Sequence, residues 1–376
     1  MKRLLFLTIG MFSMGSDNFI VVSLLSEISA AYGSSLAATS QSVSAFRFAY
    51  GISAPLFALM LARKPARFTL AAALGLFFAG NLLTILAPSL ALHLVGRVVC
   101  GIGAGIFTPL AAATAAQLVP VENRGRALGI LWGSNVAGTV LGGPVALYLA
   151  ALGGWQAGFF LILALSLLAL LGVVSLLPEM QVGTLPSLHE RILALGDHRV
   201  LGVVGVTFIT AAGSLGLFTF AAPLMENAAG KVSEALWVWG IGGIVGGYTI
   251  GYLIDYTRKP RMVMLLVMVT LLSSILSIPL LSSIPFLFLL PFFVWGLAGW
   301  ATVTPQQLTL FGLQSDNQTV LAALNGSALA IGGALGSSAA ALLLSEGFAA
   351  RNLPVAAALL IFIALLGQVA LIRRNP

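Results

Sequence analysis

Residues 156–177 read QAGFFLILALSLLALLGVVSLL, an apolar run that contains no charged side chain. A helix needs about 20 mostly apolar residues to cross a lipid bilayer, so this run is long enough. Eleven further runs of the same kind lie at about 4–28, 39–61, 68–87, 90–111, 126–150, 200–222, 235–254, 262–281, 285–306, 319–343 and 354–372. The sequence therefore predicts an all-α membrane protein with twelve transmembrane helices.

The composition of the 376-residue chain agrees with this prediction. Hydrophobic residues make up 59% and charged residues only 8%, whereas a soluble chain is roughly a quarter charged. This composition excludes a cytosolic enzyme, a nucleic-acid-binding protein and a secreted disulfide-bonded domain. The net charge of +7 does not indicate nucleic-acid binding, because the basic residues lie in small groups between apolar runs. The single cysteine, Cys100, lies inside an apolar run, so cysteine indicates neither a disulfide framework nor a metal site.

The positions of the basic residues predict the orientation of the chain. Of the 18 Lys and Arg residues, fourteen lie in segments that share a side of the membrane with the N-terminus: Lys2, Arg3, Arg63, Lys64, Arg67, Arg124, Arg126, Arg191, Arg199, Arg258, Lys259, Arg261, Arg373 and Arg374. The opposite segments hold only Lys231 and Arg351. Because cytoplasmic loops carry the excess of Lys and Arg, we expect both termini in the cytoplasm.

The chain also divides into two similar halves. The longest polar connection predicts a six-helix domain at 1–178, a cytoplasmic linker at 179–199 and a second six-helix domain at 200–376. The triplet RKP at 63–65 recurs 195 residues later, and the pair GS at 133–134 recurs 193 residues later. Two nearly equal offsets indicate paired six-helix repeats, an arrangement in which many secondary transporters bind substrate between the halves near the bilayer midplane.

Several short motifs resemble those of one transporter family. The segment GYLIDYTRK at 251–259 resembles its loop signature G-x-L-x-D-R-x-G-R, and ALMLARKPAR at 58–67 keeps the basic residues of the first-half copy. The segment LVGRVVCGIGAG at 94–105 is similar to the fourth-helix pattern with a buried Arg. GTVLGGP at 138–144 resembles the antiporter motif of the fifth helix, and GSDNFIV at 15–21 resembles the start of efflux permeases.

These motifs resemble the major facilitator superfamily, and specifically its drug:proton antiporter branch with the bacterial efflux proteins for sugars, nucleosides and drugs. The resemblance implies two pseudo-symmetric six-helix bundles in a bacterial inner membrane. It also implies a cytoplasmic gate at Asp255 and Arg258. In the fifth helix, Gly142, Gly143 and Pro144 predict a kink where the halves rock, the alternative being close packing by small residues.

Three charged residues lie well inside predicted helices: Asp17, Arg47 and Arg97. Each costs about 2.5–3.5 kcal/mol in a membrane, so we expect them to face water or one another. At 1.5 Å per residue, Asp17 lies about 18 Å and Arg47 about 12 Å below the outer surface. An arginine side chain spans that difference, so we expect an Asp17–Arg47 contact.

The charges suggest a mechanism of coupling. Burial favours a protonated carboxyl group and a nearby arginine favours the carboxylate, so a moving arginine would load and unload a proton on Asp17. We expect Arg97 to take part in coupling or substrate binding and Arg47 to bind an anionic group. The alternative is a static ion pair that holds helices together. The coupling hypothesis requires a path for water to Asp17.

Neutral polar and aromatic residues inside the runs are candidates for the substrate site, although a single Asn in a helix also serves helix–helix hydrogen bonds. The candidates are Asn18, Asn81, Asn135, Thr210, Trp295 and Asn325. The three histidines form no metal-like cluster with cysteine or with each other, so we expect neither metal nor cofactor.

Taken together, these features predict a secondary active transporter that exchanges protons for a small organic solute such as a drug, sugar or nucleoside. One chain supplies both halves, so we expect a monomer in the lipid bilayer. The alternatives are an exporter of an anionic metabolite and a facilitator without proton coupling. An intramembrane enzyme would need a catalytic dyad or metal cluster, and a sensor would need a soluble signalling domain. We find neither in the sequence.

Overall fold

The computed structural model describes residues 2–60, 64–180, 196–218, 220, 232–281, 284 and 287–374, and within these ranges it contains helices and no strands. The central part of the predicted linker, 181–195, lies outside them. The long helices of the first half are α1 (Lys2–Ser23), α3 (Leu36–Met60), α4 (Ala66–Leu86), α5 (Leu90–Gln117), α6 (Arg124–Gly153) and α7 (Gln156–Leu176). Those of the second half are α9 (His198–Phe218), α11 (Val232–Thr257), α12 (Pro260–Leu281), α13 (Leu289–Ala301), α14 (Val303–Leu313), α15 (Gln318–Ser345) and α16 (Leu353–Arg374).

The helices account for the twelve predicted spans. Ten of the described helical segments are long and apolar enough to cross a membrane. The two other spans correspond to α3 and to the consecutive helices α13 and α14. The twelve-helix prediction is therefore confirmed.

Two predicted spans are interrupted. In the first span, α1 ends at Ser23 and a second helix, α2 (Leu25–Tyr32), follows. The tenth is interrupted at Thr302, whose hydroxyl donates to the Gly299 carbonyl at 2.7 Å. Pro305 explains this second break, because proline has no N–H to bond the carbonyl four residues earlier and its ring clashes with that carbonyl.

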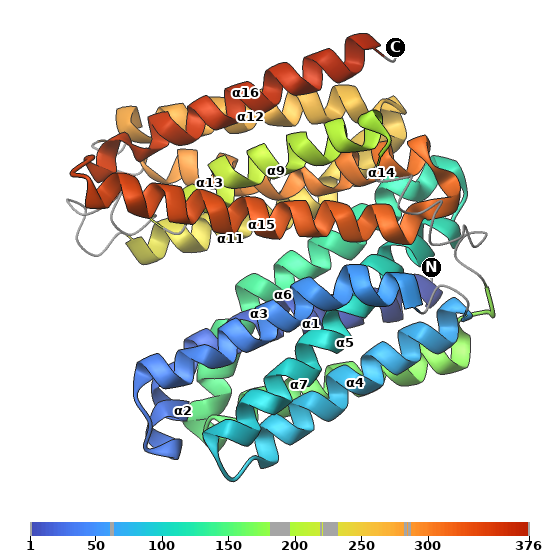
Figure 1. The fold of residues 1–376 in the computed structure, drawn as a ribbon, viewed down its shortest axis with the longest axis vertical. Coiled ribbons are helices and arrows are strands. Elements are labelled where there is room, and N and C mark those ends of the chain that lie inside the picture. Colours follow the sequence, from blue (N-terminus) through green and yellow to red (C-terminus); the bar gives the residue numbers. More distant parts are fainter. Residues whose placement is uncertain are drawn as a thin grey trace. The chain divides into compact units, whose positions relative to one another are not determined.

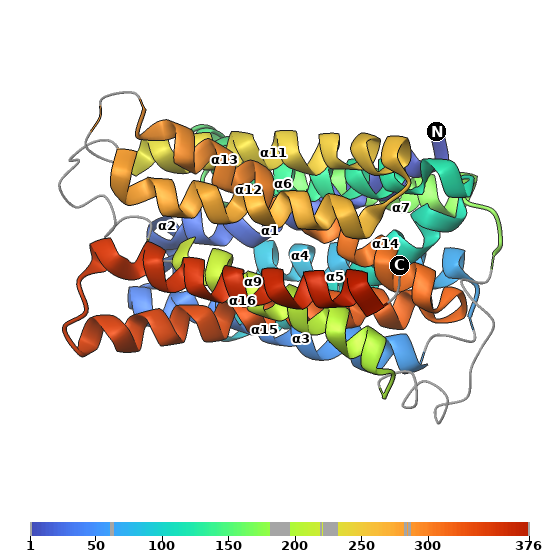
Figure 2. The same ribbon diagram turned by 90° about the horizontal axis from the view of Figure 1, so that it is seen from above.

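The chain forms two compact units. The first unit comprises 1–121, 130–185 and 318–323, and the second comprises 122–129, 186–317 and 324–376. In the first unit α5 packs between α3 and α4, while α7 packs on α1 and α4 (Figure 1). In the second unit α13 packs against α11 and α12, and α16 lies beside α9 and α12 (Figure 2).

Glycines bring the same pairs of helices into close contact in both units. In the first unit, a Cβ on Gly138 of α6 would collide with the Phe12 carbonyl of α1. In the second unit, a Cβ on Gly336 of α15 would collide with the Ala212 carbonyl of α9. These pairs are the first and fifth predicted spans of each repeat, so this helix pair is closely packed in both units.

Candidate functional site

The first unit contains a buried ion pair between α1 and α5. Arg97 donates from Nη1 to Asp17 Oδ1 at 2.9 Å and from Nη2 to Oδ2 at 2.8 Å. The relative exposure of the two side chains is 1% and 0%. Two parallel hydrogen bonds between a guanidinium and a carboxylate are strong and geometrically specific. In this conformation both charges are thus satisfied by each other, and Asp17 has no surface in contact with water.

Small residues and aromatic rings hold Arg97 in place. A Cβ on Gly96 would lie 2.6 Å from Thr84 Oγ1, so this glycine allows α4 and α5 to approach closely. The Arg97 guanidinium lies 4.7 Å from the centre of the Phe46 ring and 6.0 Å from that of Phe159. Such rings attract a cation through their negative faces.

The predicted Asp17–Arg47 contact is wrong. Both carboxylate oxygens are bonded to Arg97, and the Arg47 side chain is exposed. The face of α3 that packs against α5 carries Phe46 and Ala49, whose backbone and side-chain atoms crowd Gly101. Arg47 follows Phe46 directly and so projects about 100° away from it. The prediction used depth along the helix, which does not determine the face.

A cluster of aromatic rings lies one helical turn from Arg97 along α5. The His93 ring is 5.5 Å from that of Tyr32 and 5.9 Å from that of Trp155. His93 is fully buried, and neither of its ring nitrogens has a hydrogen-bond partner. No role for His93 was predicted from the sequence, although its spacing of four residues from Arg97 places both on one face of a helix.

Three of the asparagine candidates form hydrogen bonds within a helix or between helices. Asn135 Nδ2 donates to the Met11 carbonyl at 3.0 Å, and Asn325 Oδ1 accepts from Thr207 at 2.8 Å. Asn81 Nδ2 donates within its own helix, to the Phe77 carbonyl at 3.0 Å. The side chain of Asn18 lies outside the described residues.

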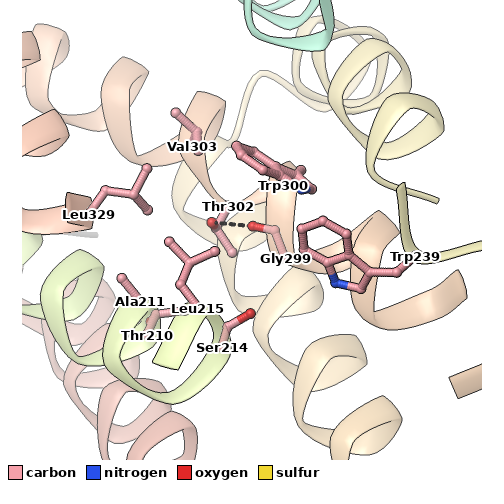
Figure 3. Close-up of a pocket in the computed structure, with 10 residues that line it drawn as sticks. All are labelled: Thr210, Ala211, Ser214, Leu215, Trp239, Gly299, Trp300, Thr302, Val303 and Leu329. Atoms are coloured by element: carbon pink, nitrogen blue, oxygen red, sulfur yellow. Dashed lines mark hydrogen bonds between the residues drawn. The ribbon is translucent and has the colours of Figure 1, made fainter. Parts of the chain in front are cut away.

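The two remaining candidates, Thr210 and Trp295, lie at or next to a pocket in the second unit. Trp295 is fully buried, and its Nε1 donates to Ser214 Oγ at 2.8 Å. Thr210 and Ser214 line the pocket from α9, and Trp239 and Trp300 line it from α11 and α13 (Figure 3). The sequence did not single out Ser214, Trp239 or Trp300 as site residues.

Asp255 lies at the end of α11 and accepts hydrogen bonds from the start of α6. Its two oxygens each accept a backbone N–H at 2.8 Å, one from Gly125 and one from Arg126. A Cβ on Gly125 would lie 2.5 Å from Oδ1 of Asp255, so only glycine allows this approach. Arg258 is exposed and, within the described part of the chain, forms no ion pair with Asp255.

The three residues predicted to kink the fifth helix lie inside α6, which runs from Arg124 to Gly153 with Pro144 in its interior. A Cβ on Gly142 would lie 2.6 Å from Ser16 Cα, and one on Gly143 would lie 2.5 Å from Ser23 Oγ. These glycines therefore serve the close contact between α1 and α6. Pro144 is exposed.

The sequence profile of the Major Facilitator Superfamily matches residues 7–337. The chain belongs to the major facilitator superfamily. Members are membrane transporters, so the chain is a multi-pass membrane protein and a secondary transporter that works by alternating access, and it is not an enzyme. The family resemblance of the sequence motifs is confirmed.

Similar proteins agree with this assignment. The chain is 27% identical over 379 residues to the inner membrane transport protein YdhP of Escherichia coli, covering 99% of this chain and 96% of YdhP. It is 28% identical over 370 residues to a chloramphenicol resistance protein of Streptomyces lividans, covering 96% of this chain and 93% of that protein. The fold matches the human organic anion transporter MFSD10 with a TM-score of 0.80 at 15% identity, covering 98% of this chain and 99% of MFSD10.

Proposed function

We propose that the protein is a proton-coupled exporter of a small organic solute and that Asp17 carries the proton. The observation that supports this proposal is the buried pair of Asp17 and Arg97, with its two hydrogen bonds of 2.9 and 2.8 Å. Charged groups inside membrane helices are costly and mark proton relays and substrate pathways. The pair joins α1 and α5, the helices that carry the family-like motifs GSDNFIV at 15–21 and LVGRVVCGIGAG at 94–105.

The proposed cycle depends on opening and closing the pair. In the conformation described here Asp17 is fully buried and bonded to Arg97. Proton uptake requires a second conformation, in which Arg97 releases Asp17 and water reaches it. Return of Arg97 would then expel the proton. The static ion pair is the alternative, and it predicts that Asp17 never exchanges a proton.

The driving force is sufficient for export. One elementary charge that crosses 100 mV is worth about 2.3 kcal/mol. Since about 1.4 kcal/mol corresponds to a tenfold ratio, one proton supports a gradient of roughly 50-fold. The cycle needs no nucleotide hydrolysis.

The relatives support the direction and place of transport. A chloramphenicol resistance protein and an inner membrane transport protein are among them, so we place this protein in a bacterial inner membrane as an exporter. The distribution of Lys and Arg supports termini on the cytoplasmic side. The protein would act as a monomer, because one chain contains both repeats.

In the proposed cycle Asp255 acts as a gate. It binds the N–H groups of Gly125 and Arg126 at the start of α6, where the helix dipole also favours a negative charge. The exposed Arg258 would interact with the gate only in another conformation.

A panel of solutes in proteoliposomes tests the proposed function. Vesicles with an acidic interior receive chloramphenicol, a neutral sugar, a nucleoside or an organic anion, while solute uptake and internal pH are both recorded. We expect at least one neutral solute to accumulate while protons leave, and a protonophore to abolish the accumulation. Solute entry that a protonophore leaves unchanged would instead identify a facilitator.

Arg47 supports a second candidate function, the export of an anionic solute. Its side chain is exposed although it lies within a predicted membrane span. If this function is correct, Arg47→Ala weakens transport of benzoate more than that of its neutral methyl ester. An equal loss for both compounds would exclude it.

A further inference from the structure

The side chains that line the pocket around Trp239 indicate which kind of solute it can bind. It lies between α9, α11, α13, α14 and α15, and its empty space of about 350 Å³ includes open solvent at its mouth. None of the lining residues in Figure 3 carries an ionisable side chain. A charged solute would lose its hydration there without gaining a partner, which is costly. A neutral solute fits better.

Three hydrogen-bond donors in the pocket wall have no partner. They are Nε1 of Trp239, Nε1 of Trp300 and Oγ1 of Thr210, and all three atoms are buried. More than about 90% of buried polar groups in proteins are hydrogen-bonded, so three unsatisfied donors in one small pocket are unusual. Because an indole N–H can only donate, an occupant must offer acceptor atoms.

The aromatic rings of the pocket are held by their neighbours. The Trp239 ring stacks on Phe218, with centres 4.0 Å apart and an angle of 24°. Its other contacts are with Trp300 at 6.0 Å and with the edge of Trp295 at 6.3 Å. Trp295 is fixed in turn by its bond to Ser214. These contacts make Trp239 a rigid apolar wall whose N–H stays unpaired.

We propose that this pocket binds a neutral, flat, mostly apolar solute through acceptor oxygens that bond Trp239, Trp300 and Thr210. The proposal rests on the proposed function insofar as this solute is the transported one. Binding to the pocket is nevertheless separate from proton coupling, because Asp17 and Arg97 belong to the other unit.

Equilibrium dialysis against the full-length protein in lipid nanodiscs tests this proposal, with empty nanodiscs to subtract partition into lipid. The probe is coumarin, a flat neutral lactone with a carbonyl acceptor. Coumarin-3-carboxylate adds a negative charge to the same ring system, and naphthalene lacks an acceptor. We expect coumarin to bind at least about 10-fold more tightly than either.

The variants Trp300→Phe and Thr210→Val each remove one donor, and Thr210→Val also keeps the shape of the side chain. We expect each to weaken coumarin binding about 3- to 10-fold, the range of one hydrogen bond, and Thr210→Val to leave naphthalene binding unchanged. The matched controls Trp237→Phe and Thr249→Val alter exposed residues of α11 and should have no effect. Thermal unfolding of each variant shows whether it is folded.

Three results would overturn the proposal. They are no coumarin binding above empty nanodiscs, equal binding of coumarin-3-carboxylate, or unchanged affinity in both folded donor variants. If one of these results were obtained and proton-coupled transport were still measured, the proposed function would still hold. Conversely, coumarin binding without proton-coupled transport of any solute would support the pocket and contradict the function.

Discussion

Each unit contains a polar contact at the same place in the repeat, and this contact is charged in the first unit and neutral in the second. In the first unit Arg97 of α5 binds Asp17 of α1, and in the second Trp295 of α13 binds Ser214 of α9. The partners are offset by 198 and 197 residues, close to the offsets of 195 and 193 in the sequence repeats. Each contact joins the first and fourth predicted spans of its repeat.

The comparison shows that the two repeats share the position of this contact and differ in its charge. Glycines also bring the first and fifth spans together in both units. A charged pair in one unit and a neutral pair in the other separates two tasks. In the functions proposed here, the first unit responds to protons and the neutral pocket of the second unit binds a solute.

Removal of Arg97 should have the largest effect on stability. Arg97→Ala leaves the Asp17 carboxylate buried without a partner, which costs about 3–5 kcal/mol. The double variant Asp17→Asn with Arg97→Met should recover much of this loss, because no charge stays buried. Thermal unfolding in detergent measures both. If Arg97→Ala alone unfolded like the unmodified protein, the pair would not be desolvated as described.

Crowding the glycine contacts should affect both units alike. A Cβ at Gly138 or Gly336 meets a backbone carbonyl, and overpacking of this kind costs about 1–3 kcal/mol. We expect Gly138→Ala and Gly336→Ala to lower the unfolding temperature by similar amounts. Gly326→Ala is the control, since a Cβ there meets nothing within 4 Å. A loss in only one unit would show that the packing is not repeated.

Disruption of the neutral pair should cost less than disruption of the charged pair. Ser214→Ala removes the hydroxyl that accepts the hydrogen bond of Trp295 and keeps the ring contacts, a loss of about 1 kcal/mol. Unfolding measurements should therefore place this variant between the unmodified protein and Arg97→Ala. A loss as large as that of Arg97→Ala would contradict the difference we draw between the units.

The smallest effect is expected at Asp255. Asp255→Asn weakens the interaction with the start of α6 by about 0.3–1 kcal/mol, the usual range for a charge at a helix terminus. Hydrogen exchange of the Gly125 and Arg126 amides should become faster. Glu122→Gln is the control, because Glu122 is exposed and lies just before α6. Unchanged exchange in Asp255→Asn would remove the proposed gate contact.

The sequence was sufficient for the helices because lipid imposes a length and composition that are visible in one dimension. It did not predict the breaks at Leu24 and Thr302, since the apolar runs continue through both. Pro305 was a signal for the second break, because a proline inside a helix removes a backbone hydrogen bond.

The site was only partly predictable because contacts depend on helix faces. Asp17 and Arg97 were recognised from charge alone, but their pairing was not, and Arg47 was assigned to Asp17 from depth. On α11, Trp237 is exposed and Trp239 is buried in the pocket wall. The sequence does not distinguish these two tryptophans, because the neighbouring helices determine which face of α11 is buried.

Proton movement in Asp17→Asn proteoliposomes tests the central claim most directly. With an acidic interior, the unmodified protein should accumulate solute while the internal pH rises. Asp17→Asn should let solute equilibrate without accumulation and without proton movement, whereas Glu27→Gln, at an exposed acid of α2, should behave like the unmodified protein. Accumulation by Asp17→Asn at the unmodified rate would contradict Asp17 as the proton carrier and leave its pair with Arg97 a structural one.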